Sequence, residues 1–358
     1  MRESHVWRTI VWTFVATGLV MLVASFDPGF LSVYGPAGVI PVSTGERIEV
    51  LVGQNAPFSK GATTDLYFRE ADATFKKVET FDDSIQCVAA ADGELIVTFA
   101  KGKSGEGGAA SSFYKDGKWV KSVSGPLDFT IIDTAEYEGS IYAQGPAGEG
   151  KGIALRKLSE DGWKPVGEAF DTGGEYMPGG MVGTDSGIAV CYSPELVVNN
   201  LQDIKSAKWH YVVFDGSAWG QSRELVEVRG KLPQVCSYGG EIAFLITNPA
   251  QKDSPVEMGI LKGEALDIVA QIPTKDRGLI VGAWLVSLGE EEFVYMVGPG
   301  KCWEVALDGF TPQEAVMRLG TPGGALIRTR IYVGVIGAGA VLLVTLGVTW
   351  FVMRVRSI

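Results

Sequence analysis

Short apolar runs alternate with glycine-containing polar turns along most of the chain. The runs IQCVAAA (85–91) and ELIVTFA (94–100) are separated by Asp-Gly, and a second Asp-Gly separates FYK from KWVKSV (118–123). Runs of this length indicate β-strands, and Asp-Gly supplies the positive φ that a tight hairpin turn needs. The pattern predicts a series of antiparallel hairpins over residues 44–320.

The hairpin pattern repeats along the chain. A large apolar residue follows the last turn of each unit, and these positions are 44, 44, 56, 47 and 44 residues apart. The six blade anchors defined in this way are Phe75, Trp119, Trp163, Trp219, Leu266 and Phe310. Four short strands in about 44 residues, repeated six times, predict an all-β, six-bladed β-propeller. A sandwich or barrel is the alternative, but neither predicts such a period.

Each anchor is expected to begin the outermost strand of its blade and to pack between neighbouring blades. Two units depart from the regular length. The extra residues of the fourth unit fall in 193–209, which are expected to form one loop. The first unit is short at its front, so residues 30–43 or 48–52 are expected to supply its inner strand and to help close the ring.

Two turns carry a recognisable motif. SEDGW (159–163) and FDGSAW (214–219) each keep an Asp, a Gly and a Trp at the corner before the last strand of a unit. This corner resembles the Asp-box of sialidase-type and photosystem-assembly-factor-type propellers, which joins the third strand of a blade to the fourth. The chain departs from the Asp-box at its Ser and Thr positions and in spacing, so the resemblance implies the fold and no particular activity.

Two uncharged apolar segments flank the repeats, at residues 9–26 and 331–353. As helices they would measure about 27 and about 35 Å, against a hydrocarbon core of about 30 Å. Tyr332 and Trp350 lie near the ends of the second segment, as interfacial aromatics do. Both segments are predicted to be transmembrane helices, the first as an uncleaved anchor. A cleaved signal peptide is the alternative for the first.

Arginines near the two segments set the predicted orientation. The terminal tails hold Arg2, Arg8, Arg354 and Arg356, whereas the facing side holds Arg328 and Arg330. This positive-inside bias predicts cytoplasmic tails and a propeller on the periplasmic or extracytoplasmic side of the inner (cytoplasmic) membrane. The resulting plan comprises tails at 1–8 and 354–358, an apolar linker at 27–43, the propeller at 44–320 and a second linker at 321–330.

Charge and composition limit the classes of partner and of catalytic chemistry that the chain can have. The 358 residues carry a formal net charge of −11, without a cluster of Lys and Arg, which argues against a nucleic-acid partner. The chain has two histidines, His5 and His210, and no Cys-x-x-Cys pair. With so few histidines and no Cys-x-x-Cys pair, the sequence predicts no catalytic triad, no metal site and no cofactor. The four cysteines are expected to be buried free thiols: Cys87, Cys191, Cys236 and Cys302.

Two groups of residues are candidates for contacts outside the propeller. The linker is unusually apolar, and its candidate interface residues are Phe30, Leu31, Tyr34, Val39 and Ile40. The second apolar segment has a face of small residues: Gly334, Gly337, Ala338 and Gly339. Small residues let membrane helices approach closely.

The sequence therefore predicts a membrane-anchored, non-enzymatic propeller that binds or supports other subunits of a membrane complex. Two alternatives stay open, an extracytoplasmic ligand sensor and a glycan-processing enzyme. The enzyme alternative rests on carboxylates in DTGGEYMPGG (171–180) and GEEEF (289–293), which are candidates for the two catalytic carboxyl groups of a glycosidase.

Overall fold

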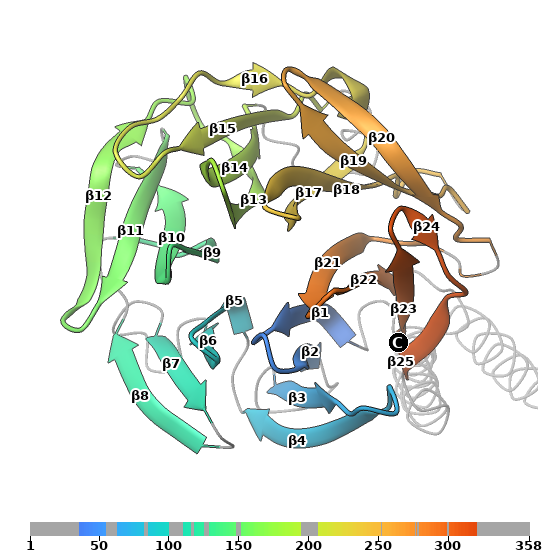
Figure 1. Cartoon of the computed structure of the whole chain (residues 1–358). Coiled ribbons are helices and arrows are strands. Elements are labelled where there is room, and N and C mark those ends of the chain that lie inside the picture. Colours follow the sequence, from blue (N-terminus) through green and yellow to red (C-terminus); the bar gives the residue numbers. More distant parts are fainter. Residues whose placement is uncertain are drawn as a thin grey trace, which may run out of the picture.

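The computed structural model describes residues 36–54, 63–81, 85–99, 110–115, 118–124, 129–147, 152–194, 207–251, 253–275, 277, 279–298 and 301–320. Within these residues the chain forms six antiparallel sheets, arranged as blades around a central axis (Figure 1). The six-bladed all-β propeller predicted from the repeat is confirmed.

Each blade is a meander of consecutive strands. Blades one and two comprise β1 (Pro36–Ser43), β2 (Ile48–Gln54), β3 (Thr63–Arg69), β4 (Phe75–Phe81), β5 (Ile85–Ala91), β6 (Glu94–Phe99), β7 (Ala110–Lys115) and β8 (Lys118–Ser124). Blades three and four comprise β9 (Asp133–Tyr137), β10 (Ser140–Pro146), β11 (Ile153–Ser159), β12 (Gly162–Phe170), β13 (Met177–Thr184), β14 (Gly187–Ser193), β15 (His210–Phe214) and β16 (Arg223–Glu224). Blades five and six comprise β17 (Leu232–Tyr238), β18 (Glu241–Thr247), β19 (Val256–Lys262), β20 (Ala265–Ile272), β21 (Gly282–Leu288), β22 (Glu291–Gly298), β23 (Lys301–Asp308), β24 (Thr311–Pro312) and β25 (Val316–Gly320). A short 3-10 turn, η3 (Val226–Val228), follows β16.

The core lies between blades. The buried apolar side chains form six clusters, and each cluster combines residues of two neighbouring blades. Between blades one and two, for example, Leu51 and Leu66 pack with Leu95 and Val97, and all four are at most 1% exposed. Because every blade buries both faces against its neighbours, the closed ring removes the apolar faces of all six sheets from water.

Four of the six anchor residues lie at the start of the fourth strand of a blade. Phe75, Trp119, Trp163 and Leu266 each lie within the first two residues of the fourth strand. Trp219 precedes β16 and forms an isolated bridge with Phe214. The extra length of the fourth unit falls where expected, between the end of β14 at Ser193 and the start of β15 at His210.

Phe310 was assigned two residues too early. It lies in the turn before β24, and the register position that Trp119 occupies in its own blade belongs to Pro312. The reason is that β24 lasts only two residues, and β25 then pairs with the first half of β23. Phe310 still packs against the preceding blade, with its ring 5.2 Å from that of Tyr238.

The predicted linker at 27–43 ends earlier than expected. Residues 36–43 form β1, the innermost strand of blade one, so the propeller begins at Pro36 and not at residue 44. Val39 is 1% exposed and packs between blades six and one. This is one of the two segments expected to supply the missing inner strand.

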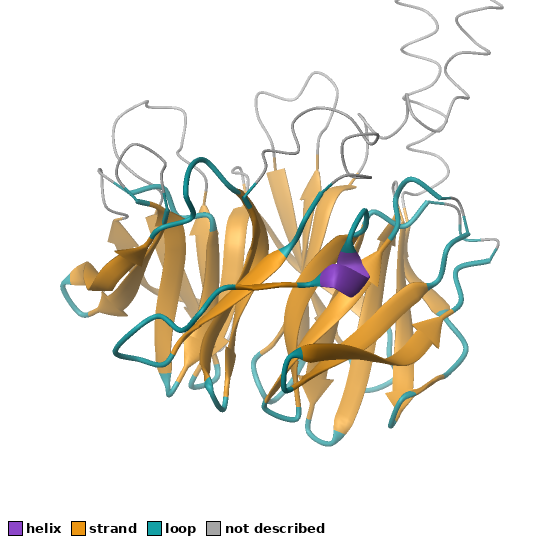
Figure 2. Cartoon of the chain, turned by 90° about the horizontal axis from the view of Figure 1, so that it is seen from above, coloured by secondary structure: helices purple, strands orange, loops and turns teal. Residues whose placement is uncertain are grey.

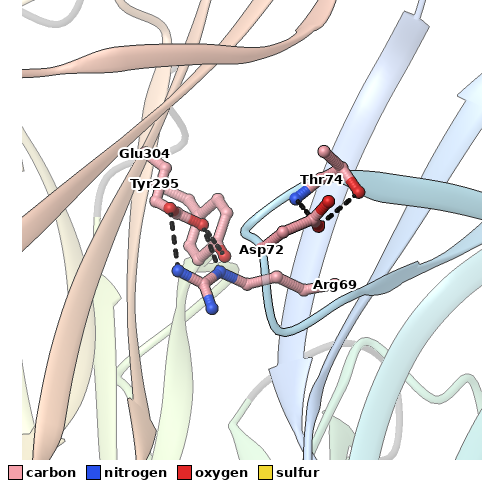
Figure 3. Close-up of polar contacts among 5 residues, drawn as sticks. All are labelled: Arg69, Asp72, Thr74, Tyr295 and Glu304. Carbon is pink, nitrogen blue, oxygen red and sulfur yellow. Dashed lines mark hydrogen bonds and ion pairs between the residues drawn. The ribbon is translucent and has the colours of Figure 1, made fainter.

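Ring closure relies on side-chain packing. No described strand passes between blades one and six, because all of β1–β4 belong to one sheet and all of β21–β25 to the other. Arg69 on β3 instead reaches across to Glu304 on β23, with Nε 2.8 Å from Oε2 and Nη2 3.2 Å from Oε1 (Figure 3). The Tyr295 hydroxyl donates to the same carboxylate at 2.6 Å. Burial lowers the pKa of Arg69, but its hydrogen bond to Glu304 and the charge of that carboxylate more than offset this, and the pKa is raised.

Both ends of the described chain lie on one face of the ring. The first and third strands of each meander run in the same direction, so Pro36 at the start of β1 and Lys301 at the start of β23 lie on the same face. Figure 2 shows the strands of the ring running between its two faces. Gly320, at the end of β25, pairs with Lys301. We call this the proximal face. The tight turns that connect first to second strands lie on the opposite, distal face.

Candidate functional site

The first strands of all six blades enclose a central channel with a cavity of about 800 Å³. Residues of β1, β5, β9, β13, β17 and β21 line it, and most of these residues are apolar or uncharged. Among the described residues that line the cavity, the charged ones are Asp133 and Glu136, both on β9. The channel is therefore a mostly neutral space with a weakly acidic wall on blade three.

Asp133 is the first residue of β9 and lies near the proximal face. Its Oδ1 accepts a hydrogen bond from the Thr134 backbone N–H at 2.9 Å, and its Oδ2 accepts one from Met181 N–H of blade four at 2.9 Å. Burial raises the pKa of Asp133 to about 6, although the two backbone bonds lower it in part. The Asp133 carboxylate thus links blades three and four through a hydrogen bond. Its raised pKa places its ionisation close to neutral pH.

A bulge in β13 brings a third blade to this carboxylate. The pairing of β13 with β14 shifts register between Pro178 and Met181, and Gly180 within the shift has a φ of 102°. A Cβ on Gly180 would lie 2.7 Å from Nε2 of Gln234 and 3.5 Å from Oδ2 of Asp133. The absence of a side chain at Gly180 therefore lets the Gln234 amide pack against the backbone of β13, close to the Asp133 carboxylate.

Gln144 on β10 completes the polar group. It pairs directly with Asp133 across the ladder, so the two side chains project from the same face of blade three. Gln144 lines the cavity and its side chain is fully buried. Neither Oε1 nor Nε2 of Gln144 has a hydrogen-bond partner among the described residues. We refer to Asp133, Gln144 and Gln234 as the polar triad of the channel.

A second polar group surrounds His210 on blade four. The Ser222 hydroxyl lies 3.4 Å from His210 Nδ1 and 2.8 Å from the Tyr192 hydroxyl, and Glu224 pairs opposite His210. Burial lowers the pKa of His210, so its imidazole is neutral at pH 7. Glu224 also pairs with Arg229. His210 lies on β15, outside the lining of the channel.

The structure describes all four cysteines of the chain. All four are free and buried, which confirms the prediction of buried free thiols. Burial raises the pKa of Cys87, which lines the channel, to about 12, so this thiol is protonated at neutral pH. No group of three or more His, Cys, Asp or Glu that would hold a metal ion is found among the described residues.

Two of the five candidate interface residues prove to be parts of the propeller. Val39 is buried between blades, and Ile40 lines the channel, so neither forms a free docking surface. This is a correction, and its reason is that β1 draws both residues into the ring. Phe30, Leu31 and Tyr34 lie outside the described residues.

The predicted membrane segments are not described either. Gly334, Gly337, Ala338 and Gly339 fall in this part of the chain, as do the segments 9–26 and 331–353. Among the residues that the structure describes, no helix has the length and apolarity needed to cross a membrane.

The polar triad was missed in the sequence. Its members are separated by 11 and 90 residues, and none belongs to a motif. The one available signal was an aspartate directly after the apolar run FTII (129–132), where an inner strand begins. The carboxylates that had been singled out in 171–180 and 289–293 do not line the channel.

No protein family matches the chain, and no curated protein matches it in sequence. Among solved structures, a gluconolactonase from Xanthomonas campestris is 14% identical, with a TM-score of 0.48 over 76% of this chain and 84% of that one. The Cps50 (Swd1) β-propeller domain of Myceliophteria thermophila is 10% identical, with a TM-score of 0.47 over 79% and 86%. A prolyl endopeptidase is 15% identical with a TM-score of 0.44, and this chain spans 45% of its length.

These similar proteins differ in activity, and at such identities no activity carries over to this chain. What the described residues establish is the architecture. The chain contains a six-bladed β-propeller.

Proposed function

We propose that this chain is a propeller held at the outer face of a membrane by apolar segments at both ends, where it serves as a non-enzymatic binding platform for other membrane proteins. The observation that carries the proposal is the common exit of both chain ends on the proximal face. Pro36 and Gly320 belong to blades one and six, which are neighbours in the ring. Two segments that leave the ring in this way can enter one bilayer side by side.

The connecting lengths fit the same arrangement. Residues 27–35 and 321–330 separate the propeller from the two apolar segments. Fully extended, connections of nine and ten residues reach about 30–35 Å. The proximal face would therefore stay within about that distance of the bilayer, and the distal face would point away from it.

The channel supports binding more than catalysis. A glycosidase needs two carboxyl groups that face one substrate bond. Asp133 has the raised pKa of a general acid, but Glu136 lies three residues further along β9. Side chains three apart on a strand point to opposite faces and are about 10 Å apart along it. Among the described residues of the channel, these two carboxylates therefore fit a catalytic pair poorly, which supports the binding role.

Gentle detergent extraction of native membranes, followed by purification of the chain, tests the proposal. We expect integral membrane proteins to co-purify in a constant ratio to the chain. Recovery of the chain alone would count against a platform. Glycoside turnover by the purified chain, lost in Asp133→Asn, would favour the enzyme instead.

A further inference from the structure

We propose that the proximal half of the central channel binds a small neutral molecule that carries hydroxyl groups, and that Gln144, Asp133 and Gln234 hold it. The proposal concerns the channel alone and does not depend on membrane attachment.

The buried amide of Gln144 is the first observation. A side chain with no exposed surface and two unpartnered polar atoms is costly, since burial removes water from groups that gain no bond in return. Native proteins seldom leave such groups unpaired. A rotation of the Gln144 side chain into the cavity that it lines would let a molecule in the channel supply the missing partners.

The convergence of three blades on one space is the second observation. Asp133 and Gln144 come from blade three, Gly180 from blade four and Gln234 from blade five. A Cβ on Gly180 would meet both the Gln234 amide and Asp133 Oδ2, so glycine at this position lets these two polar side chains approach each other. The φ of 102° is open to glycine and costly for other residues, so the approach depends on glycine.

The chemistry of the wall selects the ligand. Among the described residues lining the cavity, the charged side chains are acidic, so phosphates and carboxylates are disfavoured. A bare cation would pair with Gln144 Oε1 but would leave the Nε2 donors unsatisfied. A hydroxyl group both donates and accepts, and one hydroxyl therefore satisfies Oε1 and Nε2 together. The Asp133 carboxylate, with two of its acceptor positions taken by backbone N–H groups, has further positions for a second hydroxyl.

The size of the space agrees with a small molecule. The cavity of about 800 Å³ falls in the range of about 300–1,000 Å³ that is usual for ligand pockets. Its remaining lining is largely apolar, which suits the faces of a sugar ring or a short polyol. The ligand class is thus a monosaccharide or polyol without net charge.

Saturation-transfer NMR on the full-length chain, purified without sugar-based detergents, tests the inference. The probes are D-glucose, D-galactose, D-xylose and glycerol at millimolar concentrations, with gluconate as an anionic counterpart of similar size. We expect at least one neutral probe to bind and gluconate to bind much more weakly. Absence of binding by all four neutral probes, or equal binding of gluconate, would overturn the inference.

Two variants locate the binding. Gln144→Leu and Gln234→Leu each remove an amide from the channel, and each is expected to weaken binding of the best probe about tenfold, as loss of hydrogen bonds to the ligand does. The matched control is Gln271→Leu, the same substitution on the exposed outer strand β20, which is expected to leave binding unchanged. Gln234→Leu serves alone if Gln144→Leu does not fold. Binding that is the same in wild type and both channel variants would show that the probes bind elsewhere.

Discussion

Replacing Arg69 with leucine removes the cation from the interface that closes the ring. Glu304 would keep the hydrogen bond from Tyr295 but would lose both bonds from the guanidinium. Its side chain is 3% exposed, so water does not replace the lost partner. The variant therefore takes the guanidinium charge away from a buried carboxylate between blades six and one, where no described strand crosses to hold the blades together.

The expected cost follows from this burial. Removing one partner of a buried ion pair typically destabilises a protein by about 3–5 kcal/mol, whereas replacing both partners by apolar residues is often close to neutral. We therefore expect Arg69→Leu to lower the free energy of unfolding by about 3 kcal/mol or more. The double variant Arg69→Leu with Glu304→Leu is expected to recover part of that loss, because it removes the buried charge but also the acceptor of the Tyr295 hydroxyl.

Denaturant unfolding of the purified full-length chain measures these values. The matched control is Lys262→Leu, which breaks the exposed ion pair between Lys262 and Asp267 on blade five and is expected to change stability little. If Arg69→Leu costs no more than Lys262→Leu, the ring-closing ion pair does not stabilise the propeller. If the double variant is as unstable as the single one, the loss comes from packing and not from the unpaired charge.

Three further predictions follow from the same structure. The pKa of Asp133 rises from 3.8 to about 6 on folding, which makes ionisation of this carboxyl about 3 kcal/mol more costly in the folded state. The free energy of unfolding should therefore fall as pH rises from about 4 to about 6. Denaturant unfolding of wild type and Asp133→Asn across this pH range isolates the effect. His210→Ala should leave folding and partner recovery unchanged, and loss of partners in co-purification would show a role for the imidazole. Gly334→Leu combined with Ala338→Leu should leave the propeller folded and membrane-bound but weaken its association with partner helices, because bulky residues force close-packed helices apart. Equal yields of co-purified partners from wild type and variant would contradict this prediction.

The repeat made the fold predictable because its signals are local. Asp-Gly turns and short apolar runs each specify a hairpin within about ten residues, and the period then counts the blades. The prediction failed at Phe310, where a two-residue strand ends in Pro312 and the next strand takes over the pairing. It also failed at the start of the ring, because Val39 and Ile40 resemble an apolar linker until the rest of blade one is in place to bury them.

The channel was not predictable in the same way. Gln234 is 90 residues from Gln144, and the two approach only because the ring brings blades three and five to a common axis. The bulge that lets Gln234 approach Asp133 depends on Gly180, and a Gly-Gly pair in a sequence also fits an ordinary turn. A polar side chain inside an inner strand is visible in the sequence, but whether it is paired depends on contacts across blades.

Protease treatment of intact spheroplasts tests the central claim, a propeller held outside a membrane by both of its ends, most directly. Protease added from outside should digest residues within 36–320 while short fragments containing 9–26 and 331–353 stay in the membrane after an alkaline wash. Full protection of the propeller in intact spheroplasts, or release of the undigested chain by the alkaline wash, would contradict the account.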